Sequence, residues 1–281
     1  MLKKVLLFVN PHKDVASATA LEIAERLSER GIAYRFFSFK DKDKAPIDAT
    51  YGLAFSLGGD GTVLYAARTV SGLGIPIFPI NMGTLGFIAS IPHDRWTPVF
   101  DRFAAGDADI SKRLMLEVRV ERSGAIIERG SCLNDAVVSS SGVAKIVRLC
   151  VKTSSGNGEI SLGNYRSDGL IIATPTGSTA YSAAANGPII DPEMEAVIIN
   201  PICPFTLSNR PLVLPSPEAV VIEIEEGQRS GVLLSLDGQV TVPLAPGDKI
   251  FVQKAPYYAA LVSAGRQNFY RALRAKLAWG E

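Results

Sequence analysis

The sequence predicts an N-terminal Rossmann-like parallel α/β domain, then an antiparallel β-sandwich-like domain and a C-terminal helix that returns to the first domain. Across residues 1–110, short apolar runs alternate with segments of helical periodicity, which is typical of a parallel sheet with crossover helices. Across residues 111–260, short β-type runs follow one another and helical periodicity is nearly absent. Residues 261–281 return to a helical pattern. The fold class is therefore α/β plus all-β.

In the first domain, apolar patterning predicts a series of alternating strands and helices. Val5 to Val9 is continuously apolar, as expected for a strand buried on both faces. The helix that follows ends at Gly31, because glycine readily adopts the left-handed conformation that closes a helix. A charged turn over residues 40–46 separates the second strand from the third. The remaining elements are strands at 34–39, 53–57 and 75–80 and helices at 20–27, 62–70 and 96–103.

The second domain begins with an apolar–polar alternation over residues 114–120, which predicts a strand that ends in a Ser-Gly turn. Further β-type runs lie at 136–140, 145–151, 169–174, 219–225, 231–238 and 249–253. The last segment places Phe269, Tyr270, Leu273 and Leu277 on one face of a helix and basic residues on the other. We expect the apolar face to pack on the first domain.

Composition and charge argue against several classes of function. The formal net charge is +1 over 281 residues, whereas a general nucleic-acid binder usually carries a surplus of basic residues. The uncharged stretch over residues 69–92 is interrupted by prolines and glycines, so no membrane span is expected. Three cysteines without a C-x-x-C pair indicate reduced thiols in a cytoplasmic protein. With only two histidines, a His-built zinc site is not expected.

Glycines concentrate between the third strand and the next helix, in the run LGGDGTVLYAAR over residues 57–68. Gly58, Gly59 and Gly61 leave backbone N–H groups open to an anion, so this loop, with Thr62, predicts a phosphate site at a helix start. A plain strand–helix turn is the simpler interpretation. Phosphates would repel Asp60 unless it holds Mg²⁺ or accepts a proton. Alternatively Asp60 caps the helix, a role that Thr62 could fill instead.

GGDGT resembles the shared mark of a superfamily that contains NAD kinases and lipid kinases. The run NMGTLGF at 81–87 is similar to the N-x-G-x-x-G-F of NAD kinases and differs from the corresponding run of the lipid kinases. Four more runs resemble NAD kinase motifs and follow in the same order as in that family. They are LND at 133–135, the block at 165–189, TLSNRPLV at 206–213 and DGQ at 237–239. The resemblance to the NAD kinase family runs from Val5 to about Val252.

The resemblance implies transfer of the γ-phosphate of a nucleoside triphosphate to the 2′-hydroxyl of the adenosine ribose of NAD, giving NADP. Asp60 matches the family residue that orients this hydroxyl and accepts its proton, and Asp60 and Gly61 are also implied to contact NAD. The implied donor is ATP or polyphosphate, with Mg²⁺ or another divalent cation. Since the family forms homodimers and homotetramers, the resemblance implies a homo-oligomer. The implied partners are small molecules, and neither nucleic acid nor a membrane is expected.

The resemblance also implies a set of NAD-binding residues. Asn134 and Asp135 match a pair that binds the adenosine portion, although the second residue of the pair is commonly Glu. Arg166 and Asp168 match another NAD-binding pair. The other positions implied to lie near the dinucleotide are Lys145, Thr179, Ala180, Tyr181, Ser182, Ala183, Ala184 and Gln239.

Two alternatives to an NAD kinase stay open from the residues. Another kinase of the superfamily, acting on a lipid or a sphingoid base, would have an apolar groove and affinity for membranes. A non-catalytic sensor of NAD(P)(H) would keep the fold but should lack Asp60 or another acidic residue of the site. Asp60, Asp135 and Asp168 are all present in this chain.

Overall fold

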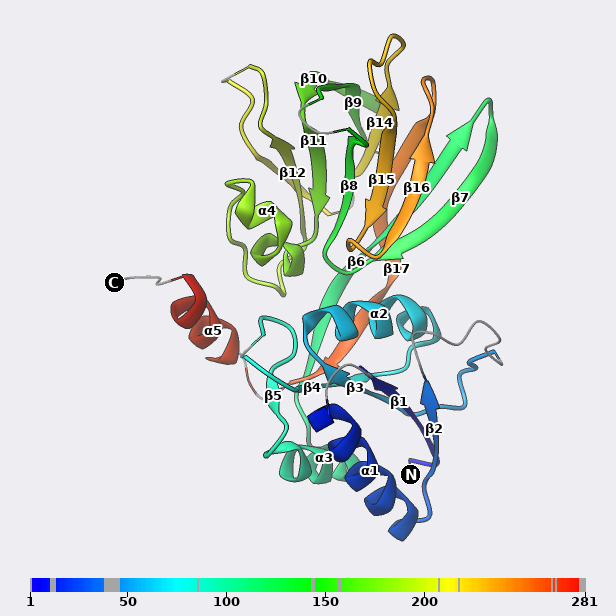
Figure 1. The fold of residues 1–281 in the computed structure, drawn as a ribbon, viewed down its shortest axis with the longest axis vertical. Helices are drawn as coiled ribbons and strands as arrows, with labels where there is room; N and C mark the ends of the chain where they lie inside the picture. The colour runs from blue at the N-terminus through cyan, green and yellow to red at the C-terminus, as the bar shows by residue number, and fades with distance from the viewer. Residues whose placement is uncertain are drawn as a thin grey trace. The chain divides into compact units, whose positions relative to one another are not determined.

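The structure is a computed structural model and describes residues 2–10, 14–37, 46–84, 86–142, 145–155, 158–206, 208–216, 218–263, 265 and 267–277. It divides into two compact units (Figure 1): unit 1 comprises Met1–Lys112 and Tyr257–Glu281, and unit 2 comprises Arg113–Pro256. The sequence predicts divisions after residues 110 and 260. Residues 38–45, which include the end of the predicted second strand and most of the charged turn, lie outside the described residues.

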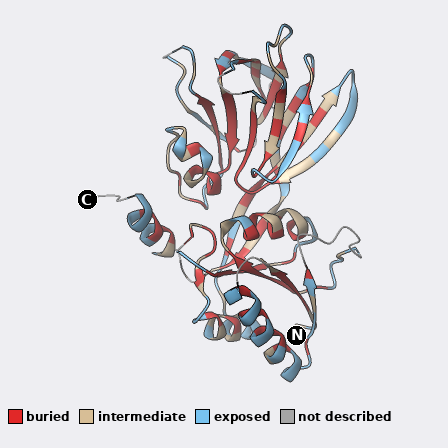
Figure 2. Cartoon of the chain, viewed as in Figure 1, coloured by how far each residue is buried: buried red, intermediate tan, exposed pale blue. Residues whose placement is uncertain are grey.

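Unit 1 is built on a parallel sheet with the strand order β2-β1-β3-β4. The short β5 and the end of β17 also pair with β4 in parallel. Nearly every residue of β1, β3 and β4 is buried (Figure 2), which explains their continuous apolar runs. The predicted parallel α/β domain is therefore confirmed. The strands are β1 (Lys4–Val9), β2 (Ala33–Phe37), β3 (Leu53–Gly58), β4 (Ile77–Asn81), β5 (Ile91–Pro92) and β17 (Lys249–Val262).

Helices cover both faces of this sheet (Figure 1). In the core shared by the sheet, α1 and α3, the ring centroids of Phe55 and Phe100 lie 5.5 Å apart. On the other face, α2 packs the ring of Tyr65 edge-on against Phe8 at 6.0 Å. The helical elements of unit 1 are α1 (Asp14–Glu29), α2 (Asp60–Val70), the 3₁₀ turn η1 (Ser71–Leu73), α3 (Trp96–Ala105) and α5 (Gln267–Leu277).

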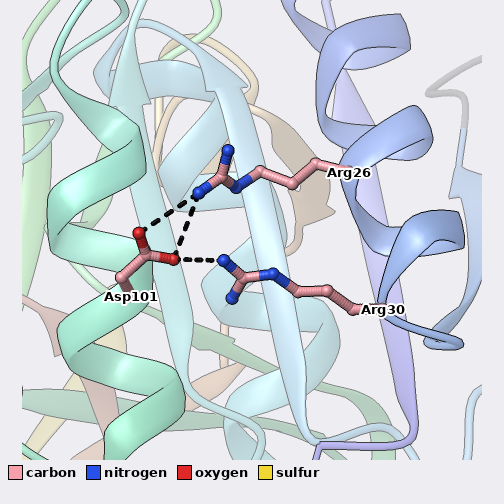
Figure 3. A network of polar contacts seen from close by, with 3 residues as sticks. All are labelled: Arg26, Arg30 and Asp101. Atoms are coloured by element: carbon pink, nitrogen blue, oxygen red, sulfur yellow. Dashed lines mark hydrogen bonds and ion pairs between the residues drawn. The ribbon is translucent and has the colours of Figure 1, made fainter.

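A surface ion-pair network joins α1 to α3 (Figure 3). Asp101 of α3 lies 3.2 Å from Arg26 of α1 and 2.6 Å from Arg30, the residue directly after α1. The hydrogen bond from Arg30 holds the pKa of Asp101 below its usual range. Because these side chains are 35 to 44% exposed, the network contributes at most about 1 kcal/mol to the free energy of unfolding.

The C-terminal helix α5 belongs to unit 1. The ring of Phe269 lies 6.2 Å from that of Phe87, which follows β4 in the chain. The buried face of α5 is narrower than predicted, because Phe269 and Leu273 are buried whereas Tyr270 and Leu277 are each 43% exposed. The predicted return of this helix to the first domain is confirmed.

Unit 2 is a sandwich of mostly antiparallel strands. One sheet has the order β13-β12-β11-β8-β15-β16, and its apolar residues share a core with those of β6, β9, β14 and β17. Ser123 and Gly124, both with positive φ, form the predicted tight turn after β6. The elements of unit 2 are β6 (Ile110–Arg122), β7 (Ala125–Cys132), β8 (Asp135–Ser140), β9 (Val147–Ser155), β10 (Gly158–Ser167), β11 (Gly169–Ala173), η2 (Thr176–Thr179), α4 (Tyr181–Ala184), β12 (Ala196–Ile202), β13 (Leu212–Pro215), β14 (Ala219–Ile224), β15 (Val232–Leu236), β16 (Val240–Leu244) and the first part of β17.

Two further predictions concern the membrane and the cysteines. Among the described helices, none combines the length and the hydropathy that a membrane crossing requires. Cys132, Cys150 and Cys203 are all free thiols, as the absence of a C-x-x-C pair indicates.

Candidate active site

The glycine-rich run lies in unit 1, at the carboxyl end of β3, where parallel sheets commonly bind ligands. Gly58 ends β3 and Gly59 is the N-cap of α2, without a side-chain hydrogen bond at the cap. The helix therefore begins at Asp60, two residues before the predicted start, and the idea that Asp60 or Thr62 caps it is wrong. Thr62 is buried inside the first turn, and a Cβ at position 58 would lie 2.0 Å from its Oγ1. Glycine at 58 is thus required by the close approach of Thr62.

The carboxylate of Asp60 is held by three consecutive backbone amides of the segment that follows β4. Its Oδ2 accepts from the N–H of Phe87 at 3.0 Å, and its Oδ1 accepts from Ile88 at 3.1 Å and Ala89 at 2.8 Å. An ionised carboxylate has about four acceptor positions. Three are occupied by donors among the described residues, which leaves one position on Oδ2 without a partner there. The arrangement fixes the orientation of the carboxylate without using another side chain.

The segment around Asp60 is itself fixed by short-range contacts. Asn81, the last residue of β4, accepts from the N–H of Gly83 at 2.9 Å and donates to the carbonyl of Thr84 at 2.8 Å. A Cβ at Gly86 would lie 2.2 Å from Asp60 Oδ1. Gly86 therefore lets the backbone approach the carboxylate closely enough for the three amides to reach it.

In unit 2, four of the predicted NAD-binding residues line one pocket of about 360 Å³. Asn134 and Asp135 come from the start of β8, and Ala180 and Tyr181 come from the start of α4. The Oδ1 of Asn134 is buried and has no hydrogen-bond partner among the described residues. The side chain of Tyr181 is exposed and offers a ring and a hydroxyl. The other lining residues are Val137, Ser235, Asp237 and Gly238.

The turn over residues 133–135 is held on its amide side by one buried carboxylate. Asp237 Oδ1 accepts from the N–H of Asn134 at 2.7 Å and of Asp135 at 3.2 Å, and Oδ2 accepts from Leu133 at 3.1 Å. Burial, followed by the negative charge of Asp237, raises the pKa of Asp135 to about 7. Asp135 therefore changes its charge near neutral pH.

Lys145 and Arg166 line a different pocket of unit 2, with a volume of about 320 Å³. Arg148 and Arg229 also line it, and none of the ion pairs among the described residues involves these four cations. The two pockets share no lining residue. Ala173, at one end of β11, pairs with Asp135, and Gly169, at the other end, pairs with Ser139. These two ends are about 13 Å apart along the strand. Arg166 comes before Gly169 and therefore lies beyond the end of β11 that is remote from Asp135.

The remaining predicted residues lie outside both pockets. Asp168 is half-buried, and its N–H donates to the carbonyl of Ile202. The hydroxyl of Ser182 is buried and accepts from Asn200, and that of Thr179 donates to the carbonyl of Thr176. Ala183, Ala184 and Gln239 do not line the pocket that contains Asn134.

Three features of the site were not found by sequence reasoning. Asp237 was seen only within the short DGQ run, and its signal was the tight Asp-Gly turn, in which Asp237 and Gly238 both have positive φ. Arg148 and Arg229 gave no local signal. The amides of 87–89 are invisible to side-chain patterns, because any residue supplies a backbone N–H.

The whole chain is similar to known proteins. It matches the ATP-NAD kinase N-terminal domain over residues 39–108 and the ATP-NAD kinase C-terminal domain over residues 133–264, together more than half of the chain. An NAD kinase of Treponema denticola is 43% identical over 279 residues, covering 99% of this chain and 97% of that protein. An NAD kinase of Citrifermentans bemidjiense is 38% identical over 291 residues, covering all of both chains.

Solved structures agree. The yeast NADH kinase complexed with NADH has a TM-score of 0.85 and 25% identity, covering 100% of this chain and 89% of that one. An NAD kinase of Archaeoglobus fulgidus in complex with ATP has a TM-score of 0.74, 22% identity and 99% coverage of both chains, which shows the shared fold. The resemblance carried by the GGDGT loop and the block at 165–189 is confirmed, and the chain belongs to the NAD kinase family.

Proposed function

We propose that this chain transfers the γ-phosphate of ATP, or of another phosphoryl donor, to the 2′-hydroxyl of the adenosine ribose of NAD, giving NADP. The observation that carries this proposal is the carboxylate of Asp60, which three backbone amides hold at the carboxyl end of a parallel sheet with one acceptor position free. Relatives named NAD kinase, matched over nearly the whole chain, support the same activity.

In the proposed reaction, Asp60 Oδ2 accepts the proton of the 2′-hydroxyl while the hydroxyl oxygen forms a bond to the γ-phosphorus. The bond between that phosphorus and the bridging oxygen of ATP breaks, and ADP leaves with the electron pair. A positioned general base of this kind contributes about 10²- to 10⁴-fold to the rate. Gly59, the N-cap of α2, has open space where a Cβ would stand, and we assign it to the close approach of the donor's phosphates. Thr62 is buried, so we assign it to the packing of the loop.

A divalent cation fits this site as a partner of the donor's phosphates. Among the described residues, no group of three or more His, Cys, Asp and Glu side chains could hold a metal ion. Mg²⁺ is commonly bound by one or two carboxylates together with substrate phosphates, so a protein cage is not needed. Because the acceptor position left on Asp60 is assigned to the substrate hydroxyl, the donor's phosphates would hold the cation, which would neutralise charge on the transferred phosphoryl group.

We assign the adenosine portion of NAD to the pocket that contains Asn134. The free Oδ1 of Asn134 accepts a hydrogen bond from the ligand, and Asp135 offers a second polar group to the ribose hydroxyls. Tyr181 presents an exposed ring for stacking on the adenine. The lining thus joins one aromatic surface to two convergent polar groups, as small-molecule pockets commonly do.

We further propose that a second copy of the chain completes the dinucleotide site in a homodimer or homotetramer. Lys145 and Arg166 line a cationic pocket that shares no residue with the pocket of Asn134. Asp168 lies just before β11, whose opposite end pairs with Asp135. In a homo-oligomer, the cationic pocket of one chain and the Asn134 pocket of another could bind the same dinucleotide, so that each site takes residues from two chains.

The test of the proposed activity is to incubate the purified protein with NAD⁺, ATP and Mg²⁺ and to follow NADP⁺ with an NADP-specific dehydrogenase. Diacylglycerol and sphingosine serve as competing acceptors in parallel reactions. Formation of NADP⁺ with no phosphorylated lipid supports the proposal. Phosphorylated lipid without NADP⁺ would replace it with a lipid kinase. Binding of NAD⁺ without turnover, with every donor tried, would indicate a sensor.

A further inference from the structure

All six backbone polar groups of the 133–135 turn are hydrogen-bonded, and four of the six bonds come from one residue. Asp237 accepts from the three N–H groups of the turn through its carboxylate, and its own N–H donates to the carbonyl of Asp135 at 2.9 Å. Thr174 supplies the other two bonds, to the carbonyls of Leu133 at 2.5 Å and Asn134 at 2.8 Å. The 133–135 turn is therefore hydrogen-bonded on one side to the β15–β16 turn and on the other to the segment after β11.

This turn has to be held in place, because it carries two groups that face the proposed adenosine site. Asn134 has a buried acceptor without a partner among the described residues, and Asp135 is a buried acid beside it. On the carbonyl side, residue 177 packs so closely on the turn that a Cβ there would lie 2.1 Å from the carbonyl oxygen of Asn134, so only glycine fits at that position. On the amide side, Asp237 alone defines where the turn lies.

We propose that Asp237 is the positioning residue of the dinucleotide pocket, and that it controls NAD binding through the 133–135 turn. The proposal rests on the proposed function, because it assigns NAD to this pocket. Both carboxylate oxygens of Asp237 are directed at the turn's backbone amides, so its effect on the ligand passes through Asn134 and Asp135. Asp237 is distinct from Asp60, which we assign to the chemistry.

The charge of Asp237 adds a second, electrostatic effect. The titratable groups that line the pocket are Asp135, Asp237 and Tyr181. Burial, and then the charge of Asp237, brings the pKa of Asp135 to about 7. Below that pH, Asp135 is a neutral acid. Above it, Asp135 is a carboxylate, and hydrogen bonds from ribose hydroxyls to a carboxylate are stronger than those to a neutral acid. Affinity for NAD should therefore rise as the pH is raised through about 7.

The variant Asp237→Asn tests both effects. Position 237 has a φ of 52°, and asparagine tolerates this left-handed conformation well, so the turn keeps its backbone. One acceptor oxygen becomes an NH₂ group facing backbone donors. We expect the Kd for NAD⁺, measured by calorimetry, to rise about tenfold, with KM rising in parallel and kcat changing less. The midpoint of the pH dependence of Kd should move to lower pH, because the neighbouring negative charge is gone.

The matched control is Asp248→Asn in the same unit. Asp248 is also fully buried and accepts a backbone N–H, from Ala245 at 2.8 Å, but it lies outside the pocket and pairs with Arg122. We expect this variant to lose stability while the Kd for NAD⁺ and its pH midpoint stay unchanged. A purely structural role for Asp237 would make the two variants alike.

Two results would count against the proposal, the first against the positioning role of Asp237 and the second against its electrostatic effect. One is Asp237→Asn with an unaltered Kd and pH midpoint. If that variant does not fold, a carbon-13 titration of the wild-type carboxyl groups decides instead, and titration of Asp135 near pH 4 would reject the electrostatic coupling to Asp237. Calorimetry needs no turnover, so a protein that binds NAD⁺ as described but makes no NADP⁺ would reject the proposed function and leave this proposal standing.

Discussion

Two aspartates organise this protein in the same way. Asp60 and Asp237 each accept hydrogen bonds from three consecutive backbone amides, at 87–89 and at 133–135. Each carboxylate thereby joins two stretches of chain through backbone donors. The two differ in the roles that we propose for them: Asp60 accepts a hydrogen bond from the substrate hydroxyl, whereas Asp237 holds the turn whose residues bind the ligand.

At Gly86, an added methyl group should displace the carboxylate of Asp60. A Cβ there would lie 2.2 Å from Asp60 Oδ1 and 3.2 Å from the carbonyl of Ala89. We expect Gly86→Ala to lower kcat by about 10²-fold, since a displacement near 1 Å has effects of that size. Gly72→Ala is the control, because its Cβ would meet only Tyr257, at 3.6 Å. Equal kcat values for the two variants would contradict the claimed role of the 86–89 segment.

At Asp135, the raised pKa predicts a stability change that depends on pH. The folded chain holds this proton up to about pH 7, whereas the unfolded chain loses it near the ordinary value of 3.8. The free energy of unfolding should therefore fall as the pH rises between these values. Asn at 135 cannot ionise, so ligand-free Asp135→Asn should exceed the wild type at pH 8 by about 2 to 4 kcal/mol, and match it near pH 4.

Urea denaturation at the two pH values measures this difference. The exposed Asp107→Asn serves as a control that should change the free energy of unfolding equally little at both. An Asp135→Asn variant no more stable than the wild type at pH 8 would show that Asp135 ionises without cost in the folded chain.

At the scale of elements, the sequence predicted what periodicity and turn chemistry encode. The order of strands and helices in unit 1, the glycine loop between β3 and α2, and the Ser123-Gly124 turn follow from local patterns. The partners of the two aspartates do not, because 27 to 29 residues separate Asp60 from its amides and 102 to 104 separate Asp237 from its own. Backbone donors carry no residue signature, so only the fold reveals them.

An ion pair between the half-exposed Arg122 and the buried Asp248 joins β6 to the turn before β17. Asp248 receives two hydrogen bonds from Arg122, each at 2.8 Å. Burial raises the pKa of Asp248, but these bonds and the amide of Ala245 lower it by more, so the net shift is downward. We expect Asp248→Asn to lower the free energy of unfolding by about 1.5 to 3 kcal/mol at pH 7.

The pH dependence of that loss follows from the direction of the shift. A depressed carboxyl pKa stabilises the fold above the unfolded value near 3.8 and loses this contribution as the pH falls through the folded pKa. The gap between Asp248→Asn and wild type, followed by urea denaturation, should therefore narrow below about pH 4. A gap that is constant from pH 3 to pH 7 would contradict this account.

At the scale of the whole molecule, the cationic pocket and the pocket of Asn134 are separate sites of one unit, and our proposal joins them through a second copy. Co-expression of two inactive chains tests this. One chain carries Arg166→Ala and keeps Asp60, and the other carries Asp60→Asn and keeps Arg166. If each site takes residues from two chains, a mixed dimer contains one intact site, and an equal mixture should recover about a quarter of wild-type activity.

The control for this experiment is each variant expressed alone, purified at the same concentration and tested by light scattering for the same oligomeric state. Recovery of no activity from mixed oligomers, with both variants folded and associated, would show that Arg166 and Asp60 serve the same chain's site or that Arg166 has no part in it.

The central claim is that Asp60 acts on the chemistry while a separate pocket binds NAD, and Asp60→Asn tests it most directly. With NAD⁺, ATP and Mg²⁺ saturating, we expect kcat for NADP⁺ formation to fall at least about 100-fold, with the Kd for NAD⁺ changing less than about tenfold. Asp107→Asn, an exposed carboxylate of the same unit, should keep full activity. An Asp60→Asn enzyme that turns over at the wild-type rate would contradict the account.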